Sequence, residues 1–354
     1  MSRYPEISPD HCVHGRIRNA SCQSCVDACP QDAWILGEDA LGLDEDACDG
    51  CGLCIPACPT GALYDHFPYV IRLVGGQAVA LFGCERSGAQ DTEAALPCVH
   101  SLGVRQLLLL YTSGVSHLLL TRDDCGSCPD CPGETLEQRV ERLNLLLGER
   151  HRPLLKLSNR PVRVWKAVLN KEALITRGTR LNRRAFLSGV SSSQILQEQL
   201  VSMDPLNRPE SRTIAPGMLL DSKSRHAHLP WVPHIEAAAC SGCDACIQLC
   251  PTEALRHETQ HEDSSRDGSS SCYRMDAPRC TGCGICVDVC SEQAIRLEAW
   301  GTWEENPLPL GDAVCHRCGN SYHVPVDSKL NADGLCPICR STGSKRLFQV
   351  LGAA

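Results

Sequence analysis

Apolar residues along this chain are concentrated in its central part, between residues 69 and 150. A continuous apolar run at Ala78–Phe82 predicts a short buried strand, and a second strand is predicted at His117–Thr121. Between them, Arg105–Tyr111 predicts a helix, because a glycine stands close to each of its ends. Along Glu134–Gly148, apolar residues recur at helical spacing until a glycine ends the pattern. These elements predict a small α/β domain over residues 69–150.

The regions on either side of this domain are more polar and resemble each other. In residues 1–68 and again in residues 237–300, each cysteine run is followed by a small residue and usually an apolar one, which predicts a repeated module. Residues 187–236 are rich in Ser, Pro and His, and with the basic segment before them they predict a helical segment and surface linker over 151–236. Residues 258–275 are expected to be a polar insertion within the second module, and residues 310–350 a separate small knuckle.

Cysteine content changes this picture most. The chain has 26 cysteines among 354 residues but only 4% aromatic residues, so it lacks bulk for large apolar cores. Cysteines separated by two or three residues rarely meet disulfide geometry with each other, whereas they can wrap around a metal. Metal ligation needs reduced thiols, and the first twenty residues have no apolar signal segment. The longest apolar run is too short to cross a membrane, and we expect a cytoplasmic protein without a membrane span.

The second module contains two regular runs, Cys240-x2-Cys243-x2-Cys246-x3-Cys250-Pro and Cys280-x2-Cys283-x2-Cys286-x3-Cys290-Ser. Three close thiolates cover one face of a [4Fe–4S] cubane, and the fourth cysteine of each run ligates the other cluster. The expected ligand sets are therefore crossed: Cys240, Cys243, Cys246 and Cys290; Cys250, Cys280, Cys283 and Cys286. Zinc fits less well, because zinc takes its four ligands as two pairs. Residues 238–298 resemble a two-cluster bacterial ferredoxin, which implies a (βαβ)2 fold and transfer of single electrons at low potential.

The first module has one regular run and one irregular run. The regular run is complete and consists of Cys48, Cys51, Cys54 and Cys58-Pro. In the irregular run, Cys29-Pro is preceded by Cys25 and Cys22 at the usual spacing, but Asn19 stands where the next cysteine is expected. Cys12 is the spare thiol nearby. The expected sets are Cys12, Cys22, Cys25 and Cys58; Cys29, Cys48, Cys51 and Cys54. His11 and His14 flank Cys12, and either imidazole is an alternative ligand, although cubanes prefer thiolate.

The middle domain contains five further cysteines: Cys84, Cys98, Cys125, Cys128 and Cys131. Three of them follow the second predicted strand, and loops at the carboxyl ends of parallel strands are where α/β sites form. The layout Phe82-Gly-Cys84, Leu96-Pro-Cys98, Gly114-Val-Ser-His-Leu118 and Cys125-Gly resembles the iron–sulfur delta subunit of methyl-viologen-type hydrogenases. That resemblance implies a fifth cluster on four of the five thiols and electron transfer to heterodisulfide reductase. A structural zinc or reduced free thiols are the alternatives.

The tail contains two cysteine pairs, Cys315-x2-Cys318 and Cys336-x2-Cys339. Two such pairs form a tetrahedral four-thiolate site, as in zinc ribbons and rubredoxins. We expect zinc here, with a mononuclear iron as the alternative. The remaining cysteine, Cys272, lies in the polar insertion and is expected to be a free thiol.

Charge is distributed unevenly. The chain has a net charge of −8, which argues against general nucleic-acid binding. Residues 150–186 nevertheless carry eleven Lys and Arg and one acidic residue, so the rest of the chain has a net charge of −18. The basic segment is either a linker helix lying on the protein's own acidic modules or a docking site for an acidic partner. Arg183-Arg184 is similar to a twin-arginine export motif but lacks the apolar stretch that follows such motifs.

Together these features predict an α+β protein with two dicluster ferredoxin modules, a small α/β domain and a zinc ribbon. Its expected cofactors are four [4Fe–4S] clusters, a fifth cluster in the middle domain, and one Zn or Fe in the tail. The expected function is the relay of single electrons between redox protein partners, as a non-catalytic subunit of a dehydrogenase, hydrogenase or heterodisulfide-reductase-like complex. The alternatives are a redox enzyme with a catalytic cysteine or cluster site in the middle domain, and a redox-sensing binding module that uses the zinc ribbon.

Overall fold

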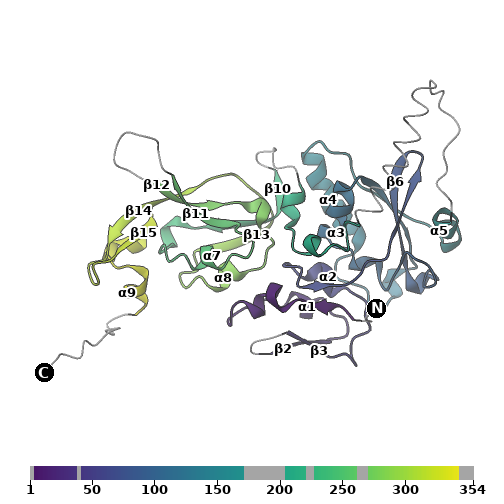
Figure 1. Ribbon diagram of the computed structural model, residues 1–354, viewed down its shortest axis with the longest axis horizontal. Coiled ribbons are helices and arrows are strands. Elements are labelled where there is room, and N and C mark those ends of the chain that lie inside the picture. The colour runs from purple at the N-terminus through teal and green to yellow at the C-terminus, as the bar shows by residue number, and fades with distance from the viewer. Residues whose placement is uncertain (1–3, 38–40, 171–203, 221–226, 261–269, 343–354) are drawn as a thin grey trace, which may run out of the picture. The chain divides into compact units, whose positions relative to one another are not determined.

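A computed structural model describes residues 4–37, 41–170, 204–220, 227–260 and 270–342 (Figure 1). Contacts divide the chain into two units, residues 1–18 with 22–228 and residues 19–21 with 229–354. Both units combine short helices with small sheets, as expected for an α+β protein. Among the helices of the described residues, none has the length and apolar character needed to cross a bilayer.

The first module of unit 1 is built from two short strand pairs and two one-turn helices. Strands β1 (Glu6–Ile7) and β4 (Leu63–Tyr64) are antiparallel, as are β2 (Trp34–Leu36) and β3 (Leu41–Leu43). The helices are α1 (Ser24–Asp27) and α2 (Cys54–Ala57). The residues that follow each cysteine run are buried, as the sequence pattern suggested: Ala33 and Trp34, Ala62 and Leu63.

The middle domain has a mostly parallel sheet, in the order β5-β6-β8-β9 with β7 beside β6. Its strands are β5 (Val70–Val74), β6 (Gln77–Cys84), β7 (Ala95–Leu96), β8 (Val115–Thr121) and β9 (Lys156–Asn159). Strand β5 is antiparallel to its neighbour, whereas β7, β8 and β9 join by parallel pairing. The helices are α3 (Val104–Thr112), α4 (Leu136–Glu149) and α5 (Val162–Leu169). The two strands and two helices expected between residues 78 and 148 are confirmed.

The sheet continues beyond residue 150, which had been expected to end the domain. Strand β9 pairs with β8, and α5 packs against the sheet. Trp165 of α5 is fully buried with Leu81 and Leu119, and its indole N–H donates to the Leu119 carbonyl at 3.0 Å. Residues 151–170 therefore belong to the middle domain instead of forming a linker. Residues 171–203, which include Arg183-Arg184, lie outside the described residues.

The rest of the expected linker is also structured where it is described. The Asn207 side chain accepts the Phe67 N–H at 2.7 Å and donates to the Phe67 carbonyl at 3.1 Å, which fixes residues 204–220 to unit 1. Residues 228–235 form strand β10 (His228–Ile235), which pairs with β13 (Ile295–Thr302). The prolines that suggested a linker are tolerated because β10 belongs to a two-stranded sheet, so one of its edges has no partner among the described strands.

Unit 2 joins the second module to the tail. Helices α7 (Ala245–Gln248) and α8 (Ile285–Asp288) each follow cysteines, and a four-stranded antiparallel sheet has the order β11-β12-β14-β15. These strands are β11 (Leu255–Gln260), β12 (Ser270–Met275), β14 (Leu308–Val314) and β15 (Ser321–Pro325), and α9 (Pro337–Ser341) is the last helix of the described residues. The expected polar insertion is thus partly a hairpin, and the tail shares its sheet. Cys272 is buried on β12, not in a polar surface loop.

Candidate metal centres

In the first module, the structure brings together the thiols of Cys12, Cys22, Cys25 and Cys58. Cys25 of α1 is buried, and burial together with the nearby thiolates of Cys22, Cys58 and Cys12 raises the pKa of Cys25 to about 12. Burial, followed by the charges of Cys58 and Cys22, also raises the pKa of Cys12. Cys58 thus lies with thiols from the other cysteine run.

The two histidines beside Cys12 have other hydrogen-bond partners. His11 is exposed, and its Nδ1 lies 2.7 Å from the Ser8 hydroxyl. His14 donates through Nε2 to the Cys22 carbonyl at 2.7 Å. Both rings therefore have a nitrogen engaged away from the thiols, whereas Cys12 is within electrostatic reach of Cys58 and Cys22.

A second group of thiols lies beside the first. Burial, followed by the charges of Cys51, Cys25 and Cys29, raises the pKa of Cys54. The Cys29 sulfur accepts a backbone hydrogen bond from Ala33 at 3.4 Å. Cys48 lies on the same loop as Cys51, three residues before it. The second group therefore combines Cys29 of one run with cysteines of the other.

The second module shows the same crossed arrangement. Burial and the charges of Cys240, Cys243 and Cys290 raise the pKa of Cys246 to about 12. Burial and four thiolates raise the pKa of Cys286, namely those of Cys280, Cys283, Cys246 and Cys250. The Cys290 sulfur accepts the Ala294 N–H at 3.2 Å. Each run's last cysteine therefore lies with the first three of the other run.

The surroundings of these thiols fit iron–sulfur clusters. A small cavity in unit 2 is lined by four of the thiols, Cys250, Cys280, Cys283 and Cys286, and by apolar side chains that include Leu255, Ile285 and Leu297. Four thiolate donors around an apolar cavity are the ligands that a [4Fe–4S] cubane takes. The ligand loop turns sharply at Gly282, whose φ is +77°, and a Cβ there would collide with the Trp231 ring at 2.3 Å.

The middle domain gathers four of its five cysteines at one edge of the sheet. Cys84 ends β6, Cys98 follows β7, and Cys125 and Cys128 follow β8, so all four lie at the carboxyl ends of parallel strands. Burial and the thiolates of the other three raise the pKa of Cys98 to about 12. Cys131 is exposed, and its sulfur lies 3.9 Å from the Pro132 carbonyl.

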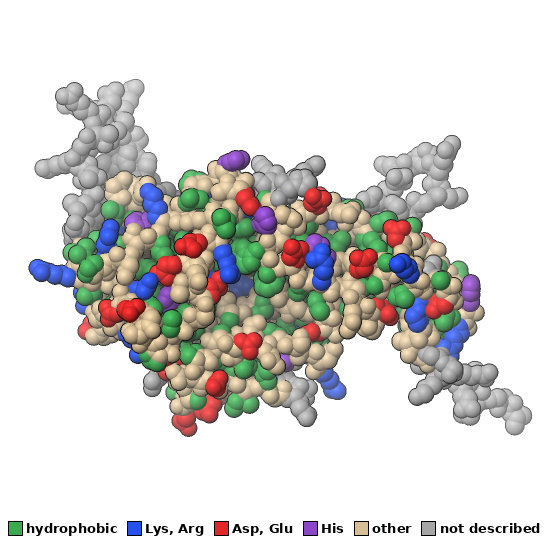
Figure 2. Space-filling model, turned by 180° about the vertical axis from the view of Figure 1, so that it is seen from behind, with side chains coloured by type: hydrophobic (Ala, Val, Ile, Leu, Met, Phe, Trp, Pro, Cys, Tyr) green, Lys and Arg blue, Asp and Glu red, His purple; other side chains and the backbone are tan. Residues whose placement is uncertain are grey.

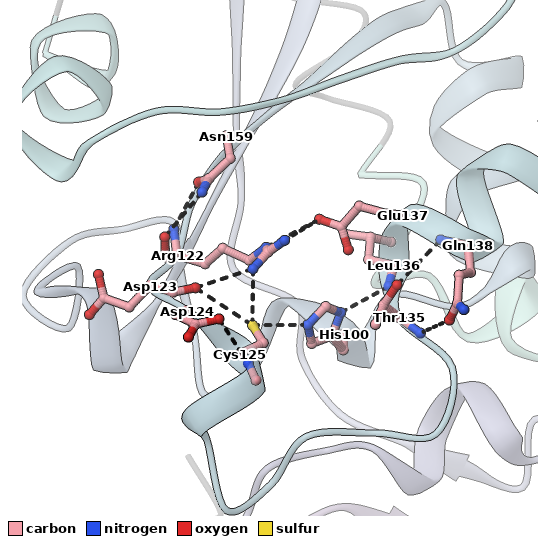
Figure 3. Close-up of polar contacts among 11 residues, drawn as sticks. His100, Arg122, Asp123, Asp124, Cys125, Thr135, Leu136, Glu137, Gln138 and Asn159 are labelled. Carbon is pink, nitrogen blue, oxygen red and sulfur yellow. Dashed lines mark hydrogen bonds and ion pairs between the residues drawn. The ribbon is translucent and has the colours of Figure 1, made fainter.

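Two side chains that the sequence analysis did not identify donate to a sulfur of this site (Figure 3). His100 is 1% exposed, and its Nδ1 accepts the Leu136 N–H at 2.9 Å, so the neutral ring carries its proton on Nε2. That Nε2 lies 3.2 Å from the Cys125 sulfur, and the Arg122 Nη1 donates to the same sulfur at 3.2 Å. The sequence signal that could have found them was their position, two residues after Cys98 and three before Cys125.

Within unit 1, the ligand loops of the first module and the middle domain touch each other. Gln31, two residues after Cys29, donates through Nε2 to Asp130 at 3.1 Å and to Asp49 at 3.4 Å. Asp130 lies between Cys128 and Cys131, and its buried carboxylate also pairs with Arg86. Hydrogen bonds thus connect both candidate sites.

The tail cysteines form a compact group in unit 2. The sulfurs of Cys315, Cys318, Cys336 and Cys339 all lie within 4.8 Å of one another. The backbone N–H groups of Cys336 and Cys318 lower the pKa of Cys315 to about 6, because they stabilise its thiolate. Four thiolates in two pairs at this separation fit a tetrahedral metal ion.

Comparison with known proteins agrees with the two outer modules. Residues 9–32 and 42–64 each match a family described as "4Fe-4S binding domain", and residues 239–295 match "4Fe-4S dicluster domain". The chain is 29% identical over 143 residues to Hydrogenase-4 component A of Escherichia coli, which covers 40% of this chain and 65% of that protein. It is 42% identical over 65 residues to a ferredoxin of Rickettsia felis, covering 18% of this chain and 55% of the ferredoxin.

A further relative is a tetrathionate reductase subunit of Archaeoglobus fulgidus, 52% identical over 42 residues, which cover 12% of this chain and 20% of the relative. The chain therefore spans less than two thirds of the length of each of these relatives. The family matches nevertheless fall on the cysteine runs described above. Both outer modules are therefore ferredoxin-like segments that match 4Fe-4S binding families.

Proposed function

We propose that this protein relays single electrons between redox partners through four [4Fe–4S] clusters and a fifth cluster in the middle domain. The proposed ligand sets for the four are Cys12, Cys22, Cys25 and Cys58; Cys29, Cys48, Cys51 and Cys54; Cys240, Cys243, Cys246 and Cys290; Cys250, Cys280, Cys283 and Cys286. The proposed set for the fifth is Cys84, Cys98, Cys125 and Cys128, without Cys131. When bound, such clusters supply one-electron chemistry whose potential depends on burial, charge and hydrogen bonds to sulfur.

The observation that carries this proposal is the crossed grouping of thiols in both modules. Buried Cys25 lies with Cys58, and buried Cys286 lies with Cys250, although each pair comes from different runs. Disulfides or two paired zinc sites do not require such crossing, whereas neighbouring cubanes do. The thiolates hold the clusters, backbone N–H groups orient the sulfurs, and the apolar walls exclude water.

The middle site is a member of the relay because its ligand loops contact those of the first module. Asp130 belongs to the Cys128 loop and Gln31 to the Cys29 loop, and their hydrogen bond of 3.1 Å keeps the two loops together. Arg86, two residues after Cys84, pairs with the same carboxylate. A site that served only as a structural zinc centre would not need this link to a cluster-binding loop.

In the tail we propose a structural zinc ion bound by Cys315, Cys318, Cys336 and Cys339. Four thiolates in two pairs favour zinc, and the sheet that the tail shares with β12 gives the ion a role in holding unit 2 together. A mononuclear iron at this position would instead add a redox centre, and metal analysis separates the two.

The partner we propose is a larger redox complex. Two relatives are named as a hydrogenase component and a reductase subunit, which supports a subunit role for this chain. The net charge of −8 favours basic partner surfaces, although Figure 2 shows acidic and basic side chains interspersed over one face. Catalysis would then take place in the partner.

Reductive titration of the anaerobically purified full-length chain tests this proposal. With one electron per cluster, we expect about five electron equivalents per chain, with electron paramagnetic resonance signals that show interacting clusters. Cys98→Ser is expected to lower the count by about one, and Cys272→Ala, which removes a buried thiol outside the proposed sets, to leave it unchanged. Uptake of about two equivalents or fewer would contradict the relay.

A further inference from the structure

The sulfur of Cys125 in the middle site accepts hydrogen bonds from two side chains. Arg122 Nη1 and His100 Nε2 each lie 3.2 Å from this sulfur (Figure 3). Hydrogen bonds from ionised donors are roughly twice as strong as those between neutral groups. The Arg122 guanidinium therefore stabilises negative charge on this sulfur and on any group that it ligates.

Both donors are held in place by contacts with other parts of the middle domain. Arg122 donates through Nε and Nη2 to Glu137 Oε1 at 3.1 and 2.8 Å, and its Nη1 donates to the sulfur and to the Asp123 carbonyl, each at 3.2 Å. Its backbone N–H donates to Asn159 at 3.1 Å, which anchors it at the end of β8. The His100 ring is oriented by the Leu136 N–H at the first turn of α4. These contacts fix the directions of both donors, so neither has to reorient when negative charge develops on the sulfur.

The neighbouring ligand set in the first module has different electrostatic surroundings. The donor to the Cys29 sulfur is a neutral group, the Ala33 N–H at 3.4 Å. Asp49 accepts the Cys51 N–H at 3.1 Å, and its negative charge raises the pKa of Cys51 after the effect of burial. A cluster gains negative charge when it is reduced. A carboxylate close to a ligand opposes that change, whereas a guanidinium bonded to a ligand favours it.

We propose that Arg122 and His100 make the middle site easier to reduce than the set of Cys29, Cys48, Cys51 and Cys54, so that electrons entering the first module collect in the middle domain. This inference rests on the proposed fifth cluster. In each step the first-module cluster is oxidised by one electron and the middle cluster is reduced by that electron. No bond forms or breaks, and Arg122 and His100 keep their protons. Both are positioning residues that act through Cys125.

Potentiometric titration followed by electron paramagnetic resonance tests the inference on the full-length chain. Cys98→Ser first identifies the signal of the middle site as the one that disappears. In Arg122→Gln, we expect that signal to appear at a more negative potential than in the parent chain. Arg122→Lys retains the charge, so its potential is expected to shift less. In His100→Gln, the new amide side chain can still accept the Leu136 N–H and donate to the Cys125 sulfur, so only a small shift in potential is expected. Arg163→Gln removes an exposed charge from the same domain and is expected to cause no shift.

The outcomes separate this inference from the proposed function. If Cys98→Ser removes no signal, the fifth cluster itself is wrong. If the signal exists and Arg122→Gln retains all of its iron but titrates as the parent does, the tuning role is overturned. If Arg122→Gln loses iron, the potentials of the middle-site signal in Arg122→Lys and His100→Gln are compared with that of the parent chain instead. Loss of iron in all three variants, but not in Arg163→Gln, would make the two residues structural and would also overturn the inference.

Discussion

Gln31 and Asp130 are 99 positions apart in the sequence, and their side chains share a hydrogen bond of 3.1 Å. Gln31 follows a cysteine of the first ferredoxin-like module, and Asp130 stands between two cysteines of the middle domain. The carboxylate of Asp130 is 5% exposed and is also paired with Arg86. The two sites are thus joined by side chains that belong to neither ligand set.

Removing this carboxylate should loosen the middle site. In Asp130→Ala, Gln31 and Arg86 lose their shared acceptor, and a lost hydrogen bond to a charged group costs about 1.5–3 kcal/mol. We expect the iron content to be unchanged but the visible absorbance of the proposed middle cluster to bleach several-fold faster in air. Asp91→Ala, at an exposed position, serves as the control. Equal bleaching rates in both variants would show that the link is dispensable.

Cys12 rather than a histidine should complete the irregular ligand set. We expect Cys12→Ser to lose about four irons per chain, or to convert that cluster to a smaller form, because its thiolate lies with Cys22, Cys25 and Cys58. Iron analysis of anaerobic protein checks this. His11→Ala and His14→Ala should keep the parent iron content, and a selective loss in either of them would assign the ligand to the imidazole.

Helix α5 should behave as part of the core of the middle domain. Trp165 is 0% exposed, and truncating a buried Trp to Ala typically costs about 3–5 kcal/mol. We therefore expect Trp165→Ala to unfold at a clearly lower temperature in circular dichroism measurements. Val164, which is 50% exposed on the same helix, provides the control Val164→Ala, expected within about 0.5 kcal/mol of the parent. If the two variants melt alike, α5 contributes nothing to the core.

The tail site should be independent of the iron clusters. Cys318 is the exposed member of its group, so Cys318→Ser removes one ligand with little change in packing. We expect this variant to lose about one zinc per chain and to keep its iron and sulfide. A parent protein that contains an extra iron and no zinc, together with a Cys318→Ser variant that loses this iron, would identify a rubredoxin-like centre instead.

The sequence predicted the parts of this fold that depend on local chemistry. Cysteine spacing is a property of one loop, and the strands and helices between residues 78 and 148 follow from short apolar patterns. The prediction failed at Trp165, because α5 is short and lies in the basic segment that was interpreted as a helical segment and linker. It failed at β10, because Pro230 and Pro233 are acceptable in a strand at the edge of a sheet. Contacts such as that of His100 with Cys125 depend on the tertiary fold, so a single sequence does not reveal them.

The central claim is that these cysteines hold iron–sulfur clusters in crossed sets of four. Its most direct test is the content of iron, acid-labile sulfide and zinc in the anaerobically purified full-length chain. The account predicts about sixteen to twenty irons, with similar sulfide, and about one zinc per chain. A protein with fewer than about eight irons, or a colourless one whose cysteines are joined as disulfides, would contradict it.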